Sequence, residues 1–161
     1  MNLTATTTRV LQSVAAFVKP APAPTRVLVV DDEESVRRFV TRVLRNAGYV
    51  VQTAAGGPEA LEAIDNGGTF DLVVTDVRMP GMSGPRFVGQ LRRQDAQAKV
   101  LYLTGYNDQL FDERGNTLWV DEVFLDKPCT VNGLLESVSL LLTGHLEPMA
   151  TAPTPSMRDV R

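Results

Sequence analysis

Five short runs of apolar and β-branched residues recur along the sequence, and their length and spacing constrain the fold more than any other feature. The predicted strands span residues 26–30, 50–54, 71–75, 99–103 and 120–125. Apolar residues at helical spacing predict helices within residues 36–47, 58–66, 84–91 and 131–143, with a weaker pattern at 107–116. Strand and helix thus alternate five times, which is typical of an α/β fold with a parallel sheet and helices on both faces. Right-handed crossovers and one reversal of direction predict a flavodoxin-like, doubly wound five-stranded sheet in the order 2-1-3-4-5, with a crevice between the first and third strands.

All of these elements fall in one predicted domain at residues 25–144, which is flanked by two segments of different composition. In residues 1–24, apolar positions between Val10 and Val18 would share one face of a short amphipathic helix, and a Pro/Ala linker follows from Pro20. We prefer a marginal helix that frays in water, because isolated helices this short rarely hold, over a helix that docks on a partner or on the domain. Residues 145–161 are predicted to be a disordered tail. The 17 residues after Gly144 are too few for a separately folded output domain, so we expect a single-domain protein.

Charge and cysteine content exclude several function classes. The net charge of −3 argues against a broad nucleic-acid-binding surface. Cys129 is the only cysteine, so no internal disulfide can form and nothing indicates an oxidising compartment. No apolar run approaches the ~20 residues that a membrane-spanning helix needs. We therefore expect a cytoplasmic protein without nucleic-acid or membrane partners.

Polar side chains stand at the carboxyl ends of four of the predicted strands. Asp31 and Asp32 follow the first strand, Asp76 the third, Thr104 the fourth and Lys127 the fifth. In open parallel sheets, ligands and chemistry gather at this edge. Because the first and third strands flank the crevice, the three carboxylates are expected to crowd together there.

This set of groups suits the transfer of a phosphoryl group. Three ionised acids in close quarters repel one another unless a cation balances them, and an all-oxygen cluster with few protein ligands suits Mg²⁺. Lys127 offers a point charge for a phosphoryl oxygen, and Thr104 offers a hydroxyl donor. Asp76 stands centrally among these groups and is the candidate carboxylate nucleophile.

Each feature also has a simpler interpretation. Asp31 and Asp32 could cap the following helix, because acids are favoured at a helix N-terminus. Thr104 could be a turn residue, and Lys127 a solvated lysine in a loop. Four such features at four strand ends, in this order, are much harder to reach by accident, so we prefer the joint interpretation.

Four motifs resemble the signature of response-regulator receiver domains, and the resemblance covers residues 25–144. The motifs are Val-Leu-Val-Val-Asp31-Asp32-Glu, Thr-Asp76-Val-Arg-Met-Pro-Gly-Met-Ser-Gly, Leu-Tyr-Leu-Thr104-Gly and Phe124-Leu-Asp-Lys127-Pro128. The resemblance implies that Asp32, Asp76 and the backbone carbonyl of Arg78 bind Mg²⁺, with Asp31 acting largely through water. It also implies that Asp76 is the phosphoacceptor, that Thr104 and Lys127 contact the phosphoryl group, and that the Lys127–Pro128 peptide bond is cis.

Partners and a switch follow from the same resemblance. A phosphohistidine on a histidine kinase or a histidine phosphotransfer protein would donate to Asp76, and the face of the first helix around Arg37, Thr41 and Arg45 would dock it. The chain would then be no enzyme in the ordinary sense, because it would catalyse only its own phosphorylation and dephosphorylation. Thr104 would move toward the added group, and Phe124 matches the switch aromatic of the family, although it could also be simply core. The output would be a protein-interaction face for an unknown downstream target, or onward relay of the phosphoryl group.

Two positions lie where the family controls the rate of dephosphorylation, and two others depart from the family pattern. Arg78 and Tyr106 occupy positions where the family tunes dephosphorylation, and we expect both side chains to shield the acyl phosphate from water. Cys129 stands where an aromatic residue is common, and Pro85 is an unusual start for its helix.

Two alternatives come from other function classes. An unphosphorylated receiver-like scaffold would need no site chemistry, and the presence of all five site residues weighs against it. A Mg²⁺-dependent aspartyl phosphatase of the haloacid-dehalogenase kind would place a second acid two residues after its nucleophile at the first strand. Asp31 and Asp32 are adjacent, so that spacing is missing.

Overall fold

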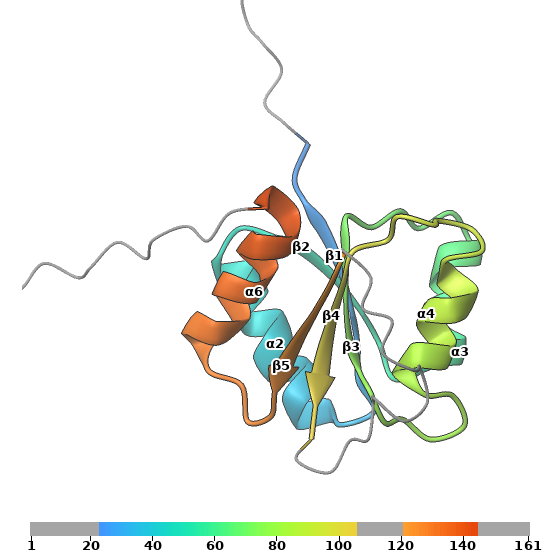
Figure 1. Ribbon diagram of the computed structural model, residues 1–161, viewed down its shortest axis with the longest axis horizontal. Coiled ribbons are helices and arrows are strands. Elements are labelled where there is room, and N and C mark those ends of the chain that lie inside the picture. The colour runs from blue at the N-terminus through green and yellow to red at the C-terminus, as the bar shows by residue number, and fades with distance from the viewer. Residues whose placement is uncertain (1–22, 106–120, 145–161) are drawn as a thin grey trace, which may run out of the picture.

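Residues 23–105 and 121–144 are described by the computed structural model, and they form a five-stranded parallel sheet with helices on both faces (Figure 1). The strands are β1 (Arg26–Val30), β2 (Val50–Ala54), β3 (Leu72–Asp76), β4 (Val100–Thr104) and β5 (Glu122–Asp126). The helices are α2 (Glu34–Asn46), α3 (Gly57–Asp65), α4 (Gly84–Leu91) and α6 (Val131–Thr143). The strand order is β2-β1-β3-β4-β5, which confirms the predicted doubly wound fold.

Three of the predictions fall on residues that the structure does not describe. They are the amphipathic segment before the linker, the weak helix at 107–116 and the tail at 145–161. Tyr106 also lies outside the described residues. Within residues 23–105 and 121–144, no helix is long and apolar enough to cross a bilayer.

β1 and β2 have the predicted bounds, whereas β3, β4 and β5 each end one residue later than the sequence pattern indicates. Asp76, Thr104 and Asp126 are the last residues of β3, β4 and β5, although each was predicted to follow its strand. The reason lies in the parallel ladder, where Asp76 pairs with Leu103 and Thr104 pairs with Asp126. A polar side chain at a strand end does not stop backbone pairing with a neighbouring strand, so hydropathy alone places the boundary too early.

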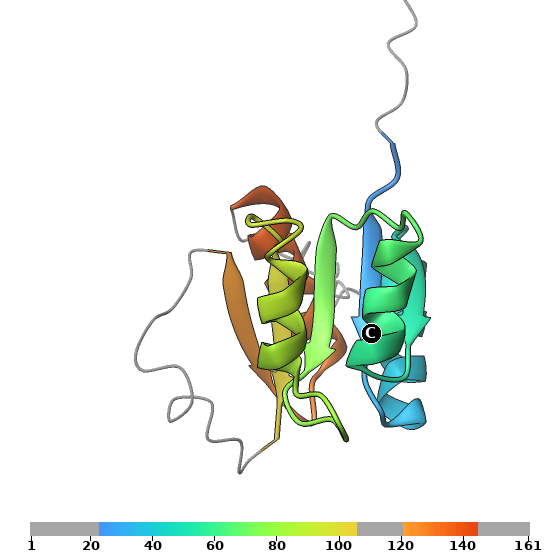
Figure 2. The same cartoon turned by 90° about the vertical axis from the view of Figure 1, so that its right-hand side faces the viewer.

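Two layers of helices bury the sheet. α2 and α6 cover one face, and α3 and α4 cover the other (Figures 1 and 2). Every residue of β3 and β4 is buried, as expected for inner parallel strands covered on both sides. β5 lies at one edge of the sheet and is only half-buried. The site residues therefore project from strands whose backbones are held by the core.

Local signals in the sequence mark the start of α4 and the end of α6. The Ser83 side chain accepts a hydrogen bond from the Arg86 backbone N–H at the start of α4, which confirms the predicted N-cap. Gly144 follows α6 in the left-handed region, with φ of 72°.

Gly84 brings the start of α4 against the end of β3. Its backbone N–H donates to the Val77 carbonyl oxygen over 2.9 Å, and a Cβ at position 84 would lie 2.1 Å from the backbone oxygen of Asp76. No side chain fits at that distance, so α4 can approach the site strand only because residue 84 is glycine.

We predict that Gly84→Ala lowers the free energy of unfolding by about 1–3 kcal/mol, because the new methyl group must displace backbone. Gly89 lies in the same helix and a Cβ there would meet nothing within 4 Å, so Gly89→Ala should raise stability by about 0.5–1 kcal/mol. Urea unfolding of both variants measures the difference. Equal stability of the two would contradict the close approach of α4 to Asp76.

Candidate functional site

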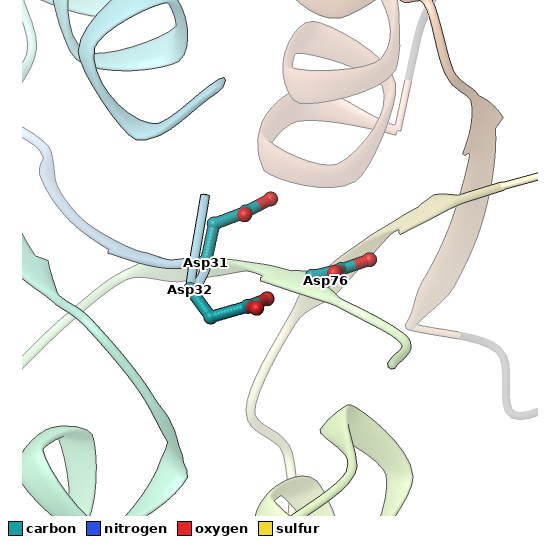
Figure 3. Close-up of side chains that lie close together, drawn as sticks. All are labelled: Asp31, Asp32 and Asp76. Carbon is teal, nitrogen blue, oxygen red and sulfur yellow. The ribbon is translucent and has the colours of Figure 1, made fainter. Parts of the chain in front are cut away.

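Three carboxylates meet at the carboxyl edge of the sheet, between β1 and β3. Val30 pairs with Thr75, so the next residues along the chain, Asp31 just after β1 and Asp76 at the end of β3, lie close to each other. One carboxylate oxygen from each of Asp31, Asp32 and Asp76 lies within 4.8 Å of the others. Asp31 and Asp32 extend from the end of β1 toward the side on which Asp76 lies (Figure 3). The structure therefore brings together the three acids that the sequence placed at two strand ends.

Asp31 is fully buried and both of its carboxylate oxygens are engaged. Oδ1 accepts from the Glu33 backbone N–H over 2.8 Å, and Oδ2 accepts from Lys127 Nζ over 2.9 Å. Arg37 also reaches this point, since its Nη1 donates to the Asp31 backbone carbonyl over 2.5 Å. Two donors thus hold the buried Asp31 carboxylate in place beside the other two acids.

Asp32 differs from Asp31 in both exposure and contacts. Its side chain is exposed, and no group in residues 23–105 or 121–144 donates a hydrogen bond to its carboxylate. This carboxylate can therefore take a ligand without losing an existing protein contact.

Asp76 presents one engaged and one open oxygen. Its Oδ1 accepts from the Val77 backbone N–H over 2.8 Å and lies 3.2 Å from Lys127 Nζ. No described residue donates a hydrogen bond to Oδ2. The carboxylate is held in place on one side and left open on the other, as a nucleophile requires.

In the part of the chain that the structure describes, Lys127 is the cation that forms ion pairs with these acids. Its backbone N–H donates to the Thr104 carbonyl over 2.7 Å, and its peptide bond to Pro128 is cis, as the resemblance implied. The ammonium lies between Asp31 and Asp76, at 2.9 and 3.2 Å. One positive charge therefore serves two of the three acids.

Burial raises the pKa of Asp76 above its ordinary value, and the nearby Asp31 charge adds to this rise while Lys127 opposes it. For Lys127, burial by itself would lower the pKa, but the hydrogen bond and charge of Asp31, followed by those of Asp76, raise it above the ordinary value. The ammonium is therefore firmly protonated at neutral pH. The three carboxylates of the described site carry more negative charge than the Lys127 ammonium balances, so a second cation would be stabilised there.

The donor set fits Mg²⁺. All three side chains offer carboxylate oxygens, Asp32 is open to solvent, and this hard cation retains several waters beside a few carboxylates. Arg78, whose backbone carbonyl is the remaining predicted ligand, lies in the loop just past Asp76 with an exposed side chain. Its role as a ligand stays a prediction.

Thr104 ends β4 and Phe124 lies in β5, and each has a partner that the sequence did not suggest. Thr104 is buried at the end of β4, and its Oγ1 donates to Asp126 Oδ1 over 2.8 Å. The Phe124 ring stacks on Tyr102, with ring centroids 5.0 Å apart and 10° between the planes. The residues of both pairings belong to the recognised motifs, but only strand register shows which residues face each other across β4 and β5.

We predict that Asp76→Asn stabilises the protein against urea at pH 7 in metal-free buffer. The pKa of Asp76 is higher in the folded than in the unfolded chain, so the folded state binds more protons and its stability falls as pH rises through that interval. The gain from Asp76→Asn should therefore shrink as the pH is lowered toward about 4. Glu62→Gln, which removes an exposed carboxylate on α3, should show no comparable gain. A loss of stability in Asp76→Asn at pH 7 would contradict this electrostatic description.

Comparison with known proteins agrees with this geometry. A model of the response regulator receiver domain family matches residues 27–139. The chain is 39% identical over 119 residues to the sensor kinase CckA of Brucella abortus, and 34% identical over 136 residues to the transcriptional regulatory protein TcrA of Mycobacterium tuberculosis. These matches cover 72% and 84% of this chain, but only 12% and 52% of the two relatives.

Solved structures show the same fold over the same region. The chemotaxis protein CheY4 of Vibrio cholerae superposes with a TM-score of 0.67 at 35% identity, covering 74% of this chain and all of that one. The receiver domain of the hybrid histidine kinase CckA superposes with a TM-score of 0.58 at 37% identity, covering 73% of this chain and 98% of that one. The chain therefore belongs to the response regulator receiver domains, the phosphoacceptor modules of two-component signalling.

Proposed function

We propose that Asp76 accepts a phosphoryl group from a phosphohistidine in a Mg²⁺-dependent reaction. The observation that carries this proposal is the state of the Asp76 carboxylate. Val77 and Lys127 hold one of its oxygens, no described residue hydrogen-bonds the other, and two further acids lie alongside. A carboxylate so placed is oriented for attack and surrounded by the charges that the transfer needs.

The transfer is an in-line displacement at phosphorus. An Asp76 oxygen forms the new O–P bond while the N–P bond to the donor imidazole breaks, and the imidazole leaves with the electron pair. Lys127 neutralises charge on the phosphoryl oxygens, and Thr104 supplies a hydroxyl donor to one of them. Mg²⁺ held by Asp32, Asp76 and the Arg78 carbonyl would neutralise charge on the same oxygens. Asp31 orients Lys127 and acts on the cation through water.

The donor is proposed to be a histidine kinase or a histidine phosphotransfer protein. Support comes from the relatives, one of which is a sensor kinase and another a transcriptional regulatory protein. A groove of about 570 Å³ opens beside Lys127, and its walls come from the start of α2 and from the loop between β5 and α6. Val36, Phe39 and Pro128 are among the residues that line it. An imidazole-bearing helix would approach the site along this groove, next to the α2 face that carries Arg37 and Arg45. Thr41, which was predicted to belong to that docking face, is buried and cannot contribute to it.

Phosphorylation is proposed to act as a switch rather than as turnover of a substrate. The added group brings roughly −1.5 to −2 charges and new acceptor oxygens to the end of β3. Thr104 on β4 and Phe124 on β5 are the side chains placed to respond, and the response is read by a protein partner or followed by relay of the group. Arg78 is exposed beside the site, where it would slow hydrolysis of the acyl phosphate.

Incubation with acetyl phosphate and Mg²⁺, followed by intact mass spectrometry, tests this function. We predict that the wild-type chain gains one phosphoryl group that hydroxylamine removes, as expected of an acyl phosphate, whereas Asp76→Asn gains none. Asp65→Asn, which alters an exposed acid at the far end of α3, should be labelled like the wild type. Equal labelling of wild type and Asp76→Asn would place the group elsewhere and refute the assignment.

A further inference from the structure

We propose that Asp126 is a positioning residue that holds the Thr104 hydroxyl away from the phosphoryl group and so sets how readily the domain switches. This inference rests on the proposed phosphorylation of Asp76. Asp126 belongs neither to the acid cluster nor to the groups expected to touch the phosphoryl group. It acts through Thr104, because its carboxylate accepts the hydrogen bond from Thr104 Oγ1 over 2.8 Å.

The pairing of β4 with β5 places Thr104 and Asp126 opposite each other. Thr104 and Asp126 are paired residues at the ends of the parallel strands β4 and β5. The next backbone contact strengthens the pairing, since the Lys127 N–H donates to the Thr104 carbonyl over 2.7 Å. Thr104 is only 8% exposed, whereas Asp126 is exposed. The buried hydroxyl therefore points toward an acceptor at the solvent boundary.

A threonine hydroxyl has one proton and can donate it to one acceptor at a time. While Thr104 donates to Asp126, that proton is withheld from a phosphoryl oxygen on Asp76. Formation of the phosphorylated contact therefore requires the bond to Asp126 to break. Because Asp126 is exposed, water can hydrate its carboxylate after release, so the exchange stays reversible.

The same pair lies next to the aromatic residues of the switch. Residues two apart on a strand project from the same face, which places Thr104 with Tyr102 and Asp126 with Phe124. Tyr102 and Phe124 are themselves paired in register and stacked at 5.0 Å. The Thr104–Asp126 bond and the Tyr102–Phe124 stack are therefore consecutive contacts between β4 and β5. Breaking the Thr104–Asp126 bond removes the contact directly beside the Phe124 ring, which is expected to move.

The negative charge of Asp126 is expected to oppose switching, as its hydrogen bond with Thr104 does. Asp126 precedes Lys127 and adds a negative charge near the place where the phosphoryl group would carry about two more. Removal of Asp126 should thus favour the phosphorylated conformation by freeing Thr104 and by lowering repulsion. The two contributions can be separated, since only the first needs the hydroxyl of Thr104.

The test is the affinity for beryllofluoride, a phosphoryl mimic that binds carboxylates, in the presence of Mg²⁺. Asp126→Ala is expected to bind it about three- to tenfold more tightly than the wild type, with Asp126→Asn between them because the amide oxygen still accepts a hydrogen bond. Glu33→Gln, which removes an exposed acid close to Asp31 without any contact to Thr104, measures the effect of charge alone. Urea midpoints of the variants confirm that each remains folded.

A double-mutant cycle with Thr104→Val, which keeps the shape and removes the hydroxyl, decides the mechanism. We expect the gain from Asp126→Ala to be at least about threefold smaller when it is combined with Thr104→Val than when it is made in the wild-type chain. An equal gain in both backgrounds, or no gain in either, would overturn the role of Asp126. Failure of the wild type itself to bind beryllofluoride would instead refute the phosphorylation of Asp76, on which the role of Asp126 depends.

Discussion

The shared ammonium of Lys127 is the interaction on which the site depends. Its Nζ lies 2.9 Å from Asp31 and 3.2 Å from Asp76, so one positive charge links the ends of β1, β3 and the β5–α6 loop. Partly buried acids cannot remain ionised together without such a partner. Among the described residues, one ammonium faces three carboxylates, and this excess of negative charge is what a divalent cation would balance.

The fold holds the ends of the strands that carry the site residues in place. The inner strands β3 and β4 are buried along their whole length, and their ends are fixed by ladder pairs rather than by loops. Gly84 allows α4 to press against the backbone of Asp76, and Arg37 reaches from α2 to the carbonyl of Asp31. Helices on both faces of the sheet therefore contact the same edge of the sheet.

Much of this arrangement could be predicted from the sequence. Alternating strand and helix patterns indicated the strand order, and the motif positions placed Asp31, Asp32, Asp76 and Lys127 at one edge, because strand ends in a parallel sheet share that edge. The exact strand boundaries could not be predicted, because backbone pairing continues through polar residues such as Thr104.

Contacts between side chains on neighbouring strands could not be predicted from the sequence either. The bond from Thr104 to Asp126 and the stacking of Tyr102 on Phe124 depend on which residues of β4 and β5 pair, and strand boundaries misplaced by one residue leave that pairing open. Phe124 is consequently both a partly buried side chain of the core and a candidate switch residue, and the two roles are compatible.

Calorimetric titration of Mg²⁺ into the wild-type chain and Asp32→Asn tests the central claim most directly, because Asp32 is the exposed acid without a protein donor among the described residues. We expect the wild type to bind one Mg²⁺, and Asp32→Asn to bind it markedly more weakly although Asp31, Asp76 and Lys127 are retained. Equal affinity in the two proteins, or no binding by the wild type, would contradict the account of an under-neutralised acid cluster completed by a divalent cation.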